Sequence, residues 1–344
     1  MDKGISRKIT LFQFVFTLGI VFFHGRSTYP ELLNSSVSQN LIYKCYMNLS
    51  GIFDVLSLSF FFFMSSYLFG IGIKNYKDAF KKVLKRFKSL VIPFILWNII
   101  TFIYFSIKNT AVLNLAFFKN LFFYDPMAGP LWYLLALFIM VAFISYHLVF
   151  KENKWITSFI YLLLFIFFVF IRGKVFPIAL IPNENWWWYG NLFYYFPVFL
   201  VGSYIGLYFP NLIDKFKYEK RIYTIIGVLL LVIGYVLPLD RRINSMIMIV
   251  GLWFFIKPKW LKKDNLLLFG TSFYIFAMHQ QLILPNYYKI IKFIWNGYTF
   301  NGYEIVFIKL MELAVVIVAS LIVKYIFKFI FSEKFNNYLT GGRN

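Results

Sequence analysis

The chain has 344 residues, of which 60% are hydrophobic and only 14% are charged. Soluble domains usually contain about 45–50% apolar residues, so this composition excludes a soluble globular protein and requires a membrane as solvent. The net charge of +21 does not indicate nucleic-acid binding, because Lys and Arg cluster in short gaps between apolar runs, which is the positive-inside pattern.

The apolar runs predict helices rather than barrel strands. Stretches such as Tyr161–Ile171 and Ala314–Val323 are apolar on every face, whereas barrel strands alternate apolar and polar residues. We therefore predict an all-α integral membrane protein, a bundle of about ten transmembrane helices forming one domain over residues 1–344. The predicted spans cover residues 8–24, 52–73, 89–107, 130–150, 155–172, 191–209, 222–238, 243–257, 265–285 and 304–327.

An even number of spans places both termini on one side of the membrane. That side also carries most of the Lys and Arg residues, including a dense group from Lys74 to Lys88, so we predict that both termini are cytoplasmic. The first span follows Lys3, Arg7 and Lys8 like a signal peptide, but no small-residue cleavage site follows it. We therefore expect it to remain as an uncleaved helix. Cys45 is the single cysteine, so no internal disulfide is possible.

Two histidines within the spans are the first candidates for chemistry. His24 ends the first span and His279 lies inside the ninth. At about 1.5 Å per residue, His24 lies ~24 Å above Lys8 and His279 lies ~22 Å above Asp264. Ionisable residues at such depth are functional candidates, and two histidines at matched depth are able to line one site. The alternative is that each histidine only bonds to a neighbouring helix.

The second span and the basic gap after it hold the next candidates. Ser65 and Ser66 interrupt a run of aromatic rings, which permits either close helix packing or a narrow tunnel. Between Lys74 and Lys88 lie seven positive residues, including Lys85 and Arg86. They serve either topology and anionic-lipid binding or the docking of a phosphorylated cosubstrate from the cytosol.

Six segments in this order resemble the membrane-bound acyltransferase-3 family of bacterial cell-envelope O-acyltransferases. His24 is similar to that family's essential histidine. The other similar segments are Phe61–Phe69, Lys85–Trp97, Gly129–Phe138, Tyr194–Gly202 and Gly270–His279. The resemblance covers nearly the whole chain. It departs from the family pattern at Gln13, where an arginine is common, and at Ser89, beside Lys88, where a second arginine is common.

The resemblance implies transfer of an acyl group, usually acetyl from acetyl-CoA, to a hydroxyl of an envelope glycan or exopolysaccharide. It implies a multi-pass protein of the bacterial cytoplasmic membrane. We expect Arg86, with Lys85 and Lys88, to bind the donor's phosphates. His24 is expected to act either as a general base or as a covalent acyl carrier. His279, Ser65 and Gln13 are expected to orient it or to stabilise an oxyanion.

The outer segments suit a sugar acceptor. Glu184 and Trp187 lie in a loop rich in amide, acid and aromatic residues, and Trp132 begins the fourth span. We assign these three residues to acceptor binding, with an interfacial aromatic belt as the alternative for the tryptophans. No metal-ligand spacing and no Gly-rich phosphate loop is visible in the sequence.

A rival function from another class is also compatible with many spans and basic inner loops. A flippase of lipid-linked oligosaccharide or an exporter of exopolysaccharide shares these features, although transporters often contain repeated halves with broken helices, and the sequence has no such repeat. A sensor or scaffold has no feature in its favour.

Overall fold

The computed structural model describes residues 3–27, 29–108, 126–148, 152–171, 187–212, 221–256 and 270–342. Each of the ten predicted spans contains a helix in these ranges. Among the described residues, five helical runs are long and apolar enough to cross a membrane. They are α1 (Lys3–His24), α2 (Leu41–Gly70), the continuous run of α3 (Tyr76–Arg86), η4 (Phe87–Val91) and α4 (Ile92–Ile107), the run containing α6 (Trp132–His147), and α15 (Gly302–Ile330). The count of ten membrane crossings stays a prediction.

The second helix is longer than the sequence predicted. It begins at Leu41 rather than at residue 52, because the Asn40 side chain caps it by accepting a hydrogen bond from the Tyr43 N–H at 3.1 Å. Such a cap satisfies a backbone donor that no carbonyl of the helix can reach. Much of the segment expected to be an outer loop is therefore helical, and Cys45 lies exposed near the start of α2.

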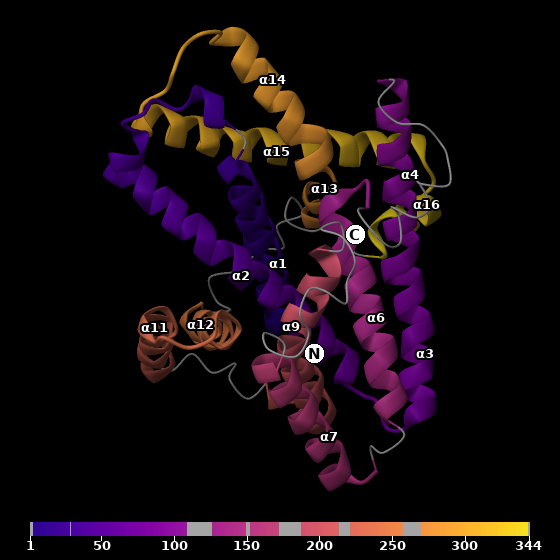
Figure 1. Ribbon diagram of the computed structural model, residues 1–344. Coiled ribbons are helices and arrows are strands. Elements are labelled where there is room, and N and C mark those ends of the chain that lie inside the picture. Colours follow the sequence, from indigo (N-terminus) through magenta and orange to yellow (C-terminus); the bar gives the residue numbers. More distant parts are fainter. Residues whose placement is uncertain are drawn as a thin grey trace.

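Small residues bring α2 and α9 (Trp187–Tyr208) into close contact. An added Cβ on Gly70 of α2 would lie 2.6 Å from the Ser203 carbonyl oxygen, and one on Gly206 of α9 would lie 2.2 Å from the Tyr67 carbonyl oxygen. Helices in membranes gain most of their association energy from such tight packing. The pair forms the centre of the bundle in Figure 1.

The helices α11 (Arg221–Val236) and α12 (Arg241–Phe255) form a hairpin beside α2 (Figure 1). Their backbones touch at Gly251, where an added Cβ would lie 2.9 Å from the Gly227 carbonyl oxygen. The buried Arg242 guanidinium pairs with Asp240 at 2.6 Å and donates to the Tyr194 carbonyl oxygen at 3.2 Å. These contacts hold the turn of the hairpin against α9.

Two sets of contacts bring together segments that lie far apart in the sequence. In the first set, the Phe300 N–H donates to the Leu32 carbonyl oxygen at 2.7 Å, and Lys292 pairs with Glu31 at 3.3 Å. In the second, the Trp97 indole N–H donates to the Leu339 carbonyl oxygen at 3.0 Å. Leu339 belongs to α16 (Glu333–Thr340), which folds back from α15 onto α4 (Figure 1).

Candidate active site

Two helices from opposite ends of the chain present one histidine each to a shared site. His24 is the last residue of α1, and His279 begins η11 (His279–Ile283), a π-helical segment between α13 (Thr271–Met278) and α14 (Leu284–Ile294). The His24 Nδ1 lies 2.8 Å from the His279 Nε2, and the two rings stack at an interplanar angle of 13°. Single π turns within helices recur at functional sites, and here the turn begins at the histidine itself.

The partners of His279 assign the protons of both rings. Its Nδ1 lies 3.0 Å from the carbonyl oxygens of Ile275 and Phe276, which only accept hydrogen bonds, so this nitrogen carries the proton. In a neutral imidazole the other nitrogen is then an acceptor. The His279 Nε2 therefore accepts from the His24 Nδ1–H, and the proton-free nitrogen of His24 is its Nε2. This is the form in which an imidazole takes a proton from a hydroxyl.

A buried charged cluster holds the backbone directly after His24. Lys309 and Glu312 of α15 are 3% and 2% exposed, and their charged groups lie 3.7 Å apart. The Lys309 ammonium donates to the Gly25 carbonyl oxygen, and Glu312 accepts from the Tyr29 hydroxyl at 3.1 Å. An added Cβ on Gly25 would lie 2.3 Å from a Glu312 oxygen, so a larger residue there would displace the Glu312 carboxylate. The cluster therefore fixes where α1 ends and how His24 is held.

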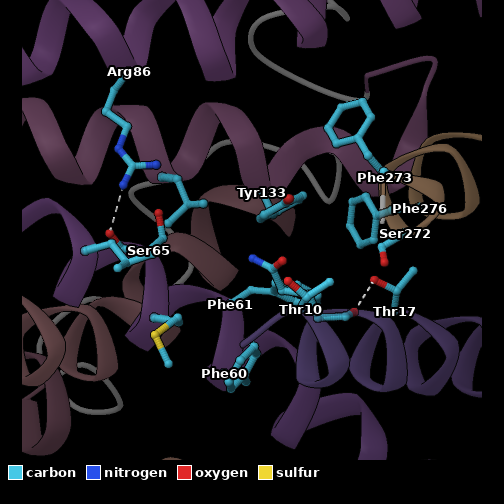
Figure 2. A pocket seen from close by; sticks show the side chains of 15 residues that line it. Thr10, Thr17, Phe60, Phe61, Ser65, Arg86, Tyr133, Ser272, Phe273 and Phe276 are labelled. Carbon is cyan, nitrogen blue, oxygen red and sulfur yellow. Dashed lines mark hydrogen bonds between the residues drawn. The ribbon is translucent and has the colours of Figure 1, made fainter. Parts of the chain in front are cut away.

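A cavity of about 330 Å³ lies between α1, α2, α6 and α13. Figure 2 shows Arg86 and Ser65 at one end and Thr17, Ser272 and Phe276 at the other. The Arg86 guanidinium donates to the Ser65 carbonyl oxygen at 3.3 Å. The His279 ring lies 5.9 Å from the Phe276 ring, centroid to centroid. The cavity thus extends from the Arg86 guanidinium to Phe276, whose ring packs against His279.

One face of α1 connects the cavity with His24. Thr10, Gln13 and Thr17 line the cavity and are followed by His24 at a spacing of seven residues. With 3.6 residues per turn, residues three, four and seven apart share one side of a helix. The polar residues of this face end at Thr17, because buried Ile20 and Val21 occupy the next turn before His24. His24 and His279 do not themselves belong to the lining.

The structure brings some of the predicted site residues together and leaves others apart. His24 and His279 meet, and Gln13, Ser65 and Arg86 share the cavity. Lys85 and Lys88 are exposed outside this cavity. Trp132 is buried against the Phe62 ring, with the centroids 6.2 Å apart, and its neighbour Tyr133 lines the cavity instead. Glu184 lies outside the described residues, and Trp187 begins α9.

Sequence reasoning missed the Lys309–Glu312–Tyr29 cluster. The signal was available, because two ionisable residues three positions apart inside an apolar span indicate a buried pair on one helix face. It also missed Tyr133 and Ser272 in the cavity, for which the sequence carries no distinctive pattern. Within the part of the chain that the structure describes, no cluster of three or more His, Cys, Asp or Glu side chains is arranged to hold a metal ion.

Comparison with known proteins gives one finding about the family. A family model described as an acyltransferase domain matches residues 7–329. Both histidines, the cavity residues and the Lys309–Glu312 pair fall within this range. No curated protein and no solved structure matches the chain.

Proposed function

The chain belongs to the acyltransferase-3 family of membrane acyltransferases, and we propose that it transfers an acyl group, acetyl in the first instance, from a cytoplasmic acyl-CoA to a hydroxyl of a cell-envelope glycan or exopolysaccharide. The observation that carries this proposal is the hydrogen bond between His24 and His279. This hydrogen bond sets the tautomer of His24, so that its Nε2 is the nitrogen able to act as a base. Both histidines lie at positions that resemble the family.

The cavity supplies a route for the donor. Arg86 at one end offers a planar guanidinium, which binds phosphate through paired hydrogen bonds. Gln13 and Thr17 lie on the face of α1 that also carries His24, and the pantetheine arm of the donor lies along these two side chains in the proposed complex. Three aromatic rings line this route for the donor. The ring centroids of Tyr133 and Phe276 lie 4.6 Å apart, and those of Phe61 and Tyr133 lie 6.0 Å apart. A linear, apolar acyl thioester passes such rings more readily than a bulky polar one.

The reaction then takes place at His24. The acceptor hydroxyl gives its proton to the His24 Nε2 while its oxygen attacks the thioester carbonyl carbon. The carbon–sulfur bond breaks, and the leaving thiolate takes the proton from the imidazolium, which regenerates the neutral base and releases the free thiol of CoA. His279 stabilises the transient positive charge by accepting the His24 Nδ1–H throughout. A positioned base of this kind contributes about 10²–10⁴-fold to a rate.

The proposal is tested by mass spectrometry of the envelope glycans from a strain that lacks the gene, complemented with wild-type protein or with His24→Ala. We expect a constant acyl mass to be lost in the deletion strain and restored by the wild type only. Complete acylation of every glycan class in the deletion strain would contradict the proposal. Truncated or internally trapped glycan, with acylation intact, would indicate the flippase or exporter function instead.

A further inference from the structure

A second cavity, separate from the candidate active site, lies between the first half of α2 and the α11–α12 hairpin. Its volume is about 610 Å³. The α2 residues that line it precede those that line the first cavity and face the opposite side of the helix, as their positions at 100° per residue require. We call this cavity the hairpin groove, and its lining includes Arg26, Asn48, Gly51, Val55, Arg241 and Asn244.

The groove carries a net positive charge at its mouth. Arg26 and Arg241 both line it, and both interact electrostatically with the carboxylate of Asp54 on α2. Among the described residues, neither guanidinium has a hydrogen-bond or ion-pair partner. Two guanidinium charges against one carboxylate leave a formal charge of one positive unit. A singly charged phosphodiester would neutralise it and would accept the donors of both guanidinium groups.

The rest of the groove lining mixes polar and apolar side chains. Asn244 lies near the arginines, where its Nδ2 donates to the Leu237 carbonyl oxygen at 2.9 Å. Its Oδ1 is buried beyond the reach of water and has no donor among the described residues, so the amide forms part of the wall and not a ligand contact. Farther along, Val55, Leu56 and Met248 form an apolar wall.

We propose that the hairpin groove binds a membrane lipid with a phosphodiester headgroup. The phosphate lies between Arg26 and Arg241, and the upper part of an acyl chain lies against Val55, Leu56 and Met248. Arg26 follows His24 by two residues, so the bound headgroup is next to the turn that ends α1. The inference does not depend on the proposed acyl transfer, since lipid binding is measurable without an acyl donor.

Native mass spectrometry of the detergent-purified full chain tests this site. Wild-type protein is mixed with dioleoyl phosphatidylglycerol, whose headgroup is a phosphodiester with free hydroxyls, or with neutral dioleoylglycerol. We expect retention of phosphatidylglycerol only, and at least about tenfold weaker retention in the variant Arg26→Gln/Arg241→Gln, as the loss of charge-assisted hydrogen bonds predicts. The matched control is Arg221→Gln, which removes an exposed arginine at the other end of α11.

A groove-filling variant keeps the test informative if the double variant folds poorly. An added Cβ on Gly51 meets only the Arg26 Nη1, at 3.8 Å, so Gly51→Leu extends into the groove without a backbone clash. We expect it to lose phosphatidylglycerol while its thermal unfolding matches that of the wild type. Equal retention by Gly51→Leu, equal retention of dioleoylglycerol, or displacement of the lipid by millimolar inorganic phosphate would each overturn the assignment.

Discussion

The Nδ1 of His24 lies 2.8 Å from the Nε2 of His279, although the two residues are 255 positions apart in the chain. The contact determines which nitrogen of each ring carries the proton, because the other nitrogen of His279 faces two carbonyl oxygens. His24 is the donor in this hydrogen bond and His279 is the acceptor, so substitutions at the two positions are expected to affect acylation in different ways.

His24 is expected to be the reacting residue. His24→Ala should lower acylation in cells by about 10²–10⁴-fold, the usual loss for a missing base, without lowering the amount of protein in the membrane. His24→Gln should not restore it, since an amide does not take up and release a proton near neutral pH. The measurement is glycan acylation beside membrane protein level. If both variants instead lose protein level and Gln partly restores it, His24 serves helix packing only.

His279 is expected to act by positioning. His279→Gln retains an oxygen that is able to accept the His24 Nδ1–H, whereas His279→Phe fills the same space without an acceptor. We expect the Gln variant to keep more activity than the Phe variant. The KM for the donor should change little in either variant, because His279 does not line the donor cavity. Equal activity of the two variants would show that the hydrogen bond has no part in the reaction.

Arg86 is expected to bind the donor more strongly than its basic neighbours do. It lines the cavity, whereas Lys85 beside it is exposed. Losing one charge-assisted hydrogen bond costs about 1.5–3 kcal/mol, which corresponds to roughly ten- to hundredfold weaker donor affinity in Arg86→Ala. Lys85→Ala is the matched control, and donor KM is the measurement. A larger effect from Lys85→Ala would move the phosphate contact out of the cavity.

The buried pair of Lys309 and Glu312 is expected to support the His24 end of α1. Glu312→Leu leaves the Lys309 ammonium buried without its carboxylate, which typically costs about 3–5 kcal/mol. The double variant Lys309→Met/Glu312→Leu removes both charges and should recover most of the thermal stability in detergent. Acylation should be low in the double variant, because Lys309→Met removes the donor to the Gly25 carbonyl oxygen. Full recovery of activity would limit the pair to a structural role.

The orientation of the chain is tested at Cys45. This residue is exposed near the start of α2, and we predict that this end of the helix faces outward. A membrane-impermeant thiol reagent should therefore label it in intact cells whose outer membrane, if present, has been made permeable. Lys77→Cys in a Cys45→Ser background is the control and should be labelled only after lysis. The reversed pattern would show that both termini lie outside.

The sequence alone was sufficient for the helical architecture and for the family. Apolar runs that are uniform on every face form helices in lipid whatever their neighbours are, because the backbone has no other way to satisfy its hydrogen bonds. Each predicted span accordingly contains a helix in the described residues. The start of α2 was misjudged by eleven residues, because a side-chain cap at Asn40 extends the helix beyond its apolar part.

The candidate site depended on the tertiary structure. Matched depth suggested that His24 and His279 share a layer of the membrane, but only helix packing determined that their rings touch and which nitrogens face each other. Arg86 was already preferred from the chemistry of its guanidinium, but its place in the cavity lining emerged only from the fold. The same holds for the contact of Lys309 and Glu312 with Gly25 and for the hairpin groove. Hydrophobicity and charge are properties of each residue along the chain, whereas hydrogen-bond geometry and cavity shape arise between residues that only folding brings together.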